Sequence, residues 1–219
     1  MAHKESTARL GAVTVGIAPL ALLGAFMWHP HIPGRLPNNA AIGDAVAADV
    51  TGWGLAHLAA AGASAILILA FLVVRNYLRD AGEDRWSAFG LPFVIVGSVL
   101  FAVLPGMEFA PLAAVEAGAD PAAAQAALEP WFLPVLLTGA VMFAIGLLGF
   151  ARALTGSRIL GGATGLVVVA LVIMAASRFV PVAAVQLYVQ GVAALVALLP
   201  LAFQIGNHPV PAAAVPQRA

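Results

Sequence analysis

The sequence predicts an all-α membrane protein, a bundle of six transmembrane helices, and three observations lead to this fold class. Six stretches contain no Asp, Glu, Lys or Arg, and each approaches the length of about 20 apolar residues that a helix needs to cross a bilayer. The composition is 62% hydrophobic and only 9% charged, against about 25% charged in an ordinary soluble domain. The mean hydropathy is +0.99. The predicted spans cover residues 10–28, 51–74, 87–107, 131–151, 159–178 and 182–205.

The first span, 10–28, is expected to be a retained helix and not a cleaved signal peptide. Its apolar stretch is longer than the hydrophobic region of a usual signal peptide, and the sequence Trp-His-Pro-His that follows does not match a small-residue cleavage site. The next segment, from Pro30 to Asp49, is rich in proline, glycine and asparagine. We therefore expect irregular structure between the first two spans.

The later connections are predicted from charge and turn chemistry. The densely charged segment from Arg75 to Arg85 must be solvated, so it separates the second and third spans. Asp120 followed by Pro121 is a good N-cap with proline at the first helical position, which predicts a short interfacial helix before the fourth span. A short Gly-Ser turn then separates the fourth span from the fifth.

The chain is predicted to contain one domain, residues 1–206, that includes all six spans. Residues 207–219 contain repeated proline and alanine, a composition typical of a disordered cytoplasmic tail. Glycines recur along one stripe of the fourth span, where they favour close helix packing. The stripe consists of Gly139, Gly146 and Gly149.

Basic residues favour one orientation in the membrane. With the N-terminus in the cytoplasm, only Arg35 and Arg178 lie outside, and the other basic residues lie inside. Those are Lys4, Arg9, Arg75, Arg79, Arg85, Arg152, Arg158 and Arg218. The expected protein is therefore a multi-pass protein of the plasma (inner) membrane with both termini cytoplasmic. Abundant alanine and arginine suggest a bacterial source.

The few polar side chains within the spans are the candidate functional residues, because ionisable groups are costly inside a membrane. By the predicted topology they gather toward the outer leaflet, and the midplane has no charged residue, which argues against an ion pump or a self-contained active transporter. The candidate ligand-binding residues are His57, Glu108, Arg178, Gln186 and Gln190.

The preferred functional interpretation is a non-enzymatic, permease-like or accessory protein with an outward-facing polar pocket and no cofactor. The pocket would bind a small molecule or a lipid-like ligand, with Arg178 either holding an anionic head group or pairing with Glu108. The lipid bilayer is the main expected partner, and a homo-oligomer or a larger membrane complex is compatible with the sequence. Nucleic acid is not an expected partner, because the basic cluster is juxtamembrane and balanced by acids.

The alternative interpretation is a membrane metalloenzyme or a haem-binding redox protein with its ligands on the outer side. The candidate metal ligands are His29, His31 and His57, with Glu108 as a further carboxylate, a set suited to zinc or copper. A haem would need two opposed histidines near the outer surface. Cysteine is absent, and no nucleophile elbow or phosphate-binding loop is found. The layout resembles that of six-span bacterial membrane proteins of similar length.

Overall fold

The computed structural model describes residues 2–208, and this part of the chain is all-α. The elements are α1 (Ala2–Trp28), α2 (Asn39–Ala48), α3 (Val50–Asp80), α4 (Arg85–Met107), α5 (Phe109–Glu116), α6 (Pro121–Ser157), the 3₁₀ turn η1 (Gly161–Ala163), α7 (Thr164–Ser177), the π-helical turn η2 (Val185–Val189) and α8 (Gln190–Asn207). Most of the tail predicted at 207–219, including Arg218, lies outside the described residues.

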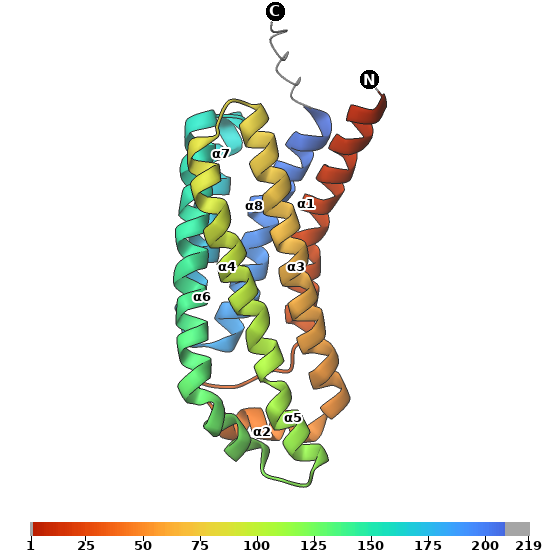
Figure 1. Cartoon of the computed structure of the whole chain (residues 1–219), viewed down its shortest axis with the longest axis vertical. Coiled ribbons are helices and arrows are strands. Elements are labelled where there is room, and N and C mark those ends of the chain that lie inside the picture. The colour runs from red at the N-terminus through yellow and green to blue at the C-terminus, as the bar shows by residue number, and fades with distance from the viewer. Residues whose placement is uncertain (1, 209–219) are drawn as a thin grey trace, which may run out of the picture.

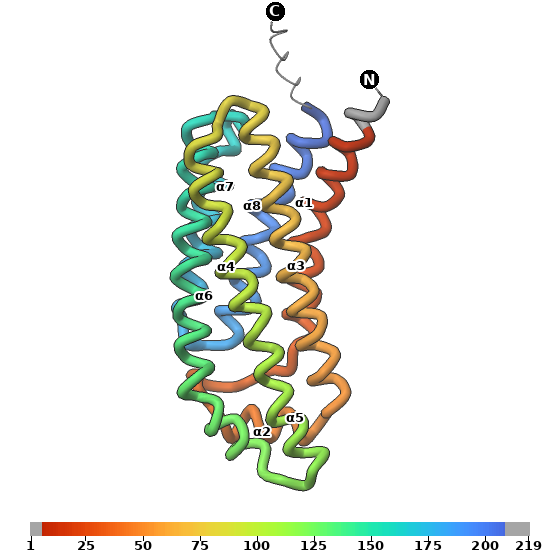
Figure 2. The backbone as a smooth tube through the Cα atoms, in the orientation of Figure 1, coloured from red at the N-terminus to blue at the C-terminus, as the bar shows by residue number. Residues whose placement is uncertain are grey.

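Six helices run side by side in a closed bundle (Figure 1). Helix α1 packs against α3 and α8, α4 packs against α3 and α6, and α7 packs against α6 and α8. The beginning of α1, the end of α8 and the turn between α3 and α4 lie together at one end, which we call the termini end (Figure 2). The short helices α2 and α5 cover the opposite end, which we call the α2–α5 end.

Five helices are long and apolar enough to cross a membrane, which indicates a multi-pass membrane protein. They are Ser6–Trp28, Val50–Asp80, Arg85–Glu116, Pro121–Ser157 and Val185–Asn207. The fifth predicted span, 159–178, corresponds to the shorter apolar helix Gly161–Ser177, so the count of six spans stays a prediction. Large apolar side chains such as Leu10 (68% exposed) and Phe203 (68% exposed) cover the outside of the bundle, a surface suited to lipid.

Two connecting segments differ from the sequence-based prediction. The segment 30–49 is not wholly irregular, because its second half forms α2, whose first turn is capped by the Asn38 side chain. The predicted cap at Asp120 is confirmed, since its carboxylate accepts hydrogen bonds from the backbone of Ala122 (2.8 Å) and Ala123 (3.3 Å). The helix that it starts is nevertheless not short, because it continues through Pro130 as part of α6.

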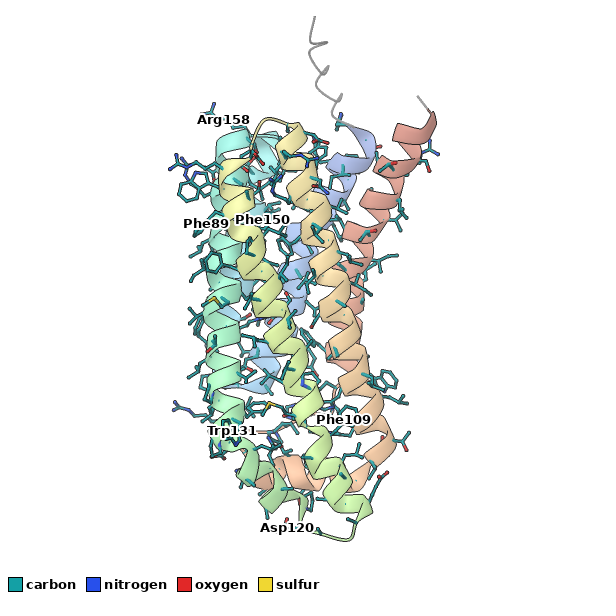
Figure 3. All side chains as sticks on the ribbon, viewed as in Figure 1. Phe89, Phe109, Asp120, Trp131, Phe150 and Arg158 are labelled. Atoms are coloured by element: carbon teal, nitrogen blue, oxygen red, sulfur yellow. The ribbon has the colours of Figure 1, made fainter. Side chains whose placement is uncertain are left out.

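Two prolines bend α6 where the sequence predicted a break between a short helix and the fourth span. Helix α6 contains Pro130 and Pro134, and each removes one backbone hydrogen bond without ending the helix. Figure 3 shows α6 bending near the labelled Trp131, between the two prolines. The first turns of α6 are thereby carried beneath the bundle, where α6 packs against α2 and α5.

The predicted glycine stripe brings α4 and α6 into close contact. A Cβ atom added to Gly97 would lie 2.5 Å from the backbone nitrogen of Phe143, and one added to Gly146 would lie 2.6 Å from that of Val94. Real Cβ atoms do not approach backbone so closely, so only glycine fits at these two positions. The small residues therefore serve backbone packing, as expected in membrane bundles.

Candidate functional site

A cavity of about 250 Å³ lies inside the bundle toward its α2–α5 end. Its wall is mainly apolar and comes from α1, the segment that follows it, α2, α3, α4, α6 and the segments around α7 and η2. The polar groups in this wall are few: His29, His57, Glu108, Gln125, Glu129, Arg178 and Gln186. A concave, mainly apolar space with a few convergent polar groups is the usual form of a small-molecule site.

The structure places four of the five predicted ligand-binding residues in the cavity wall, and the fifth contacts one of them. His57, Glu108, Arg178 and Gln186 line the cavity. Gln190 lies just behind it, fully buried, where its side-chain oxygen accepts a hydrogen bond from Arg178. The structure thus brings most of the predicted residues together at one end of the bundle.

His57 and Glu108 form the central polar contact of the cavity. His57 Nε2 lies 2.6 Å from Glu108 Oε2, and His57 Nδ1 lies 2.7 Å from the backbone oxygen of Trp53. Because a carbonyl oxygen only accepts, Nδ1 must carry the hydrogen of that second bond. The Trp53 ring stacks on the imidazole, with 4.3 Å between centroids, and its Nε1–H donates to the Glu108 backbone oxygen (3.0 Å).

His29 completes a cluster with these two residues. It follows the end of α1, and its ring centroid lies 4.8 Å from that of His57. Its Nδ1 lies 2.8 Å from the backbone oxygen of Pro30, so this nitrogen also carries a hydrogen. Burial, and secondarily the nearby His57, lowers the pKa of His29 and favours its neutral form. One ligand atom from each of His29, His57 and Glu108 lies within 4.8 Å of the others.

The structure brings together part of the predicted metal-ligand set. His29, His57 and Glu108 lie together, whereas His31 is exposed and is not in this group.

Arg178 is buried beside the cavity, and it has no carboxylate partner among the described side chains. Its guanidinium donates to Gln190 Oε1 (3.2 Å) and to the backbone oxygen of Gly97 (3.4 Å). It also lies over the rings of Phe143 (3.6 Å to the centroid) and Phe101 (4.3 Å). These contacts stabilise the cation, but none of them neutralises its charge.

The predicted pairing of Arg178 with Glu108 is not present. Among the described side chains, the ion-pair partner of Glu108 is His57, and no carboxylate oxygen lies within 4.0 Å of Arg178. Gln186 instead donates to the Arg178 backbone oxygen (3.3 Å) from the π-helical turn η2. Such turns occur mostly as single interruptions of α-helices and are frequent at functional sites.

Several wall residues were missed by the sequence-based reasoning. Trp53 was not among the predicted site residues, but only 1% of it is exposed and it stacks on His57. Gln125 and Glu129 were not predicted to belong to the site either, yet both line the cavity. The available signal was that Gln125 and Glu129 are four residues apart in the helix capped by Asp120, which places them on one helical face.

Comparisons with known proteins assign no relative. No family model, no curated protein and no solved structure matches this chain. Function must therefore be argued from the cavity itself.

Proposed function

We propose that this chain is a six-span, non-enzymatic membrane protein that binds a small or lipid-like ligand with an anionic head group in its outward-facing cavity, acting as a permease-like or accessory protein. The protein would reside in the plasma (inner) membrane, with both termini in the cytoplasm. The observation that carries the proposal is the buried, uncompensated guanidinium of Arg178 beside an apolar cavity.

Charge balance supports an anionic ligand. Arg178 is 4% exposed and retains its full positive charge, because an arginine side chain stays protonated in proteins. A buried charge without a counter-ion is costly, and the cost falls when a carboxylate or phosphate binds. The planar guanidinium also offers the paired donors that match those two groups.

The shape of the cavity supports an apolar body attached to that head group. Phe101 and Phe132 lie in the wall together with several leucines, and the volume of about 250 Å³ suits a short chain or a small ring system. Gln186 adds a directional hydrogen-bonding group close to Arg178. Such a wall would bind an amphipathic molecule in one orientation.

At the opposite end of the bundle, the arginines whose side chains the structure describes are exposed or paired, and none is buried like Arg178. At the termini end, Arg79 bonds to Asp80 (3.0 Å) and Arg75 pairs with Asp84, so their charges are balanced locally. These arginines fit the role of topological anchors on the cytoplasmic side. The working end would then be the α2–α5 end, outside the cell.

The direct test is ligand binding by purified protein in a neutral maltoside detergent. Octanoate, a short amphipathic carboxylate, is the probe, and its cationic counterpart octyltrimethylammonium is the control ligand. We expect octanoate to raise the thermal unfolding temperature in a concentration-dependent way, because it binds only the folded state. Octyltrimethylammonium should have no such effect.

The matched variants are Arg178→Gln and Arg35→Gln, since Arg35 is an exposed arginine of the segment that precedes α2. Arg178→Gln should weaken octanoate binding by at least about tenfold, because a hydrogen bond to a charged group contributes about 1.5–3 kcal/mol. Arg35→Gln should leave it unchanged. Equal binding by the wild type and Arg178→Gln would overturn the proposal.

A further inference from the structure

We propose that His29, His57 and Glu108 bind a divalent transition-metal ion, with an open coordination position that faces the cavity. This site is independent of the anion-binding role of Arg178. It rests on the convergence of two imidazoles and a carboxylate, whose ligand atoms lie within 4.8 Å of one another, and on how the two rings are held.

Both imidazoles are fixed in the same tautomer by backbone carbonyls. His29 Nδ1 bonds to the Pro30 oxygen at 2.8 Å, and His57 Nδ1 bonds to the Trp53 oxygen at 2.7 Å. In a neutral ring this leaves Nε2 as the nitrogen with a free lone pair. Metal-binding histidines characteristically donate their other N–H to a carbonyl or carboxylate, which fixes the tautomer and orients the ring.

The contact between His57 and Glu108 needs a positive species between its atoms. With the hydrogen of a neutral His57 on Nδ1, the lone pair of Nε2 faces Glu108 Oε2 at 2.6 Å. Two lone pairs at that distance repel each other. A shared proton or a metal ion converts the repulsion into attraction, and the nearby third donor on His29 favours the metal.

The geometry needs only small side-chain movements to form the site. Zinc bonds to histidine nitrogen at about 2.0–2.1 Å and to carboxylate oxygen at about 2.0–2.2 Å, so tetrahedral ligand atoms lie roughly 3.3–3.5 Å apart. The cluster reaches this spacing if His29 approaches by up to about 1.5 Å and Glu108 moves slightly away from His57. His29 and Glu108 are only partly buried, so their side chains have room to adjust.

The donor set indicates the class of metal. Imidazole and carboxylate together suit Zn²⁺ and Cu²⁺, whereas Mg²⁺ and Ca²⁺ prefer sets made of oxygen alone. Three protein ligands leave the fourth tetrahedral position for water or a ligand group, as in metal sites that act on other molecules. All three residues line the cavity, so that position is reachable from within it.

The experiment measures metal content and affinity directly. Purified protein in detergent is stripped with chelator, titrated calorimetrically with Zn²⁺, Cu²⁺ or Mg²⁺ in the absence of octanoate, and assayed for bound metal. We expect about one Zn²⁺ or Cu²⁺ ion per chain and no stoichiometric Mg²⁺. His29→Asn, His57→Asn and Glu108→Gln should each weaken Zn²⁺ binding at least about tenfold, the lower limit seen when groups that merely orient ligands are changed.

His31→Asn is the matched control, because His31 is exposed and two residues from His29. It should bind Zn²⁺ like the wild type. If His57→Asn fails to fold, His29→Asn decides the question, because His29 is only partly buried and makes a single local hydrogen bond. Absence of stoichiometric Zn²⁺ or Cu²⁺, or unchanged affinity in the His29 variant, would leave a shared proton as the bridge and overturn the metal site.

The result is separable from the test of anion binding. Arg178→Gln should lose octanoate binding but keep its metal, whereas His29→Asn should lose the metal. If one of these two variants does not behave as expected, the other proposal is still tested by its own variant.

Discussion

Energetic coupling between His57 and Glu108 is the most direct consequence of the observed cavity. The perturbation is a double-mutant cycle with His57→Phe and Glu108→Leu, measured with chelator present so that only the direct contact counts. The His57 side chain is 1% exposed and that of Glu108 is 15% exposed, so each single change leaves a largely buried partner unpaired. The double change removes both polar groups together.

The expected magnitudes follow from that burial. Leaving a buried polar group unsatisfied costs about 1–3 kcal/mol, and more when the group stays charged. Because Glu108 retains some exposure, water replaces part of the lost interaction, and the upper values for buried ion pairs do not apply. We therefore expect a coupling free energy of about 1–3 kcal/mol, with the double variant less destabilised than the sum of the singles.

Thermal unfolding in detergent measures the cycle. For a chain of this size, 1 kcal/mol corresponds to roughly 2–4 °C in the unfolding temperature. The parallel cycle of Glu108→Leu with Arg178→Leu is the control and should be additive within about 0.5 kcal/mol, because these two residues form no ion pair. Additivity in the first cycle, or equal coupling in the second, would refute the pairing described above.

Two further predictions concern the bundle. Gly97→Ala should destabilise it by about 1–3 kcal/mol, because the added methyl group forces α4 away from α6. Gly62→Ala, with open space around its Cβ position, should stabilise α3 by up to about 1 kcal/mol. Unfolding of the purified variants measures both, and equal effects would show that α4 and α6 do not pack as described. Reporter fusions after Gly82 and after Gly118 should read cytoplasmic and external, respectively, and the reverse readout would invert the proposed topology.

The helical architecture was predictable because a bilayer imposes a single length on every crossing. Long uncharged stretches predicted α3 and α8 well, and the charged segment between Arg75 and Arg85 correctly separated α3 from α4. The fifth stretch also formed a helix, but its α-helical part, α7, begins only at Thr164, after the 3₁₀ turn η1. Hydropathy alone does not report where a helix begins when small residues such as Gly161 and Gly162 precede it.

The connecting segments were less predictable because their composition fits more than one structure. Proline and glycine between Pro30 and Pro37 did end the first helix, but the alanines from Ala40 onward restored helical propensity once Asn38 supplied a cap. Pro130 looked like a boundary, yet the helix passes through it. A proline ends a helix only where no packing compensates the lost hydrogen bond, and here α6 packs against α4 on one side and α2 on the other.

The candidate site was predictable in its position but not in its pairings. Position along each apolar stretch placed His57, Glu108 and Arg178 at one end of the predicted bundle. Which of these side chains are in contact depends on the rotation of each helix and on the order of helices around the bundle. No local sequence pattern predicts either property. Glu108 therefore bonds to His57 on the neighbouring α3, whereas Arg178 lies against Phe101 and Phe143.

The aromatic surroundings explain how the two charged features coexist in one cavity. Arg178 lies over two phenylalanine rings, whose electron-rich faces stabilise a cation without neutralising it. Trp53 supports the His57–Glu108 pair instead. Its Nε1–H donates to the backbone oxygen of Glu108, and its ring stacks on the His57 imidazole. One side of the cavity thus presents a permanent cation, and the other presents donors that need a cation. A carboxylate that paired with Arg178 would lower the cost of its buried charge, which is why the proposed ligand is anionic.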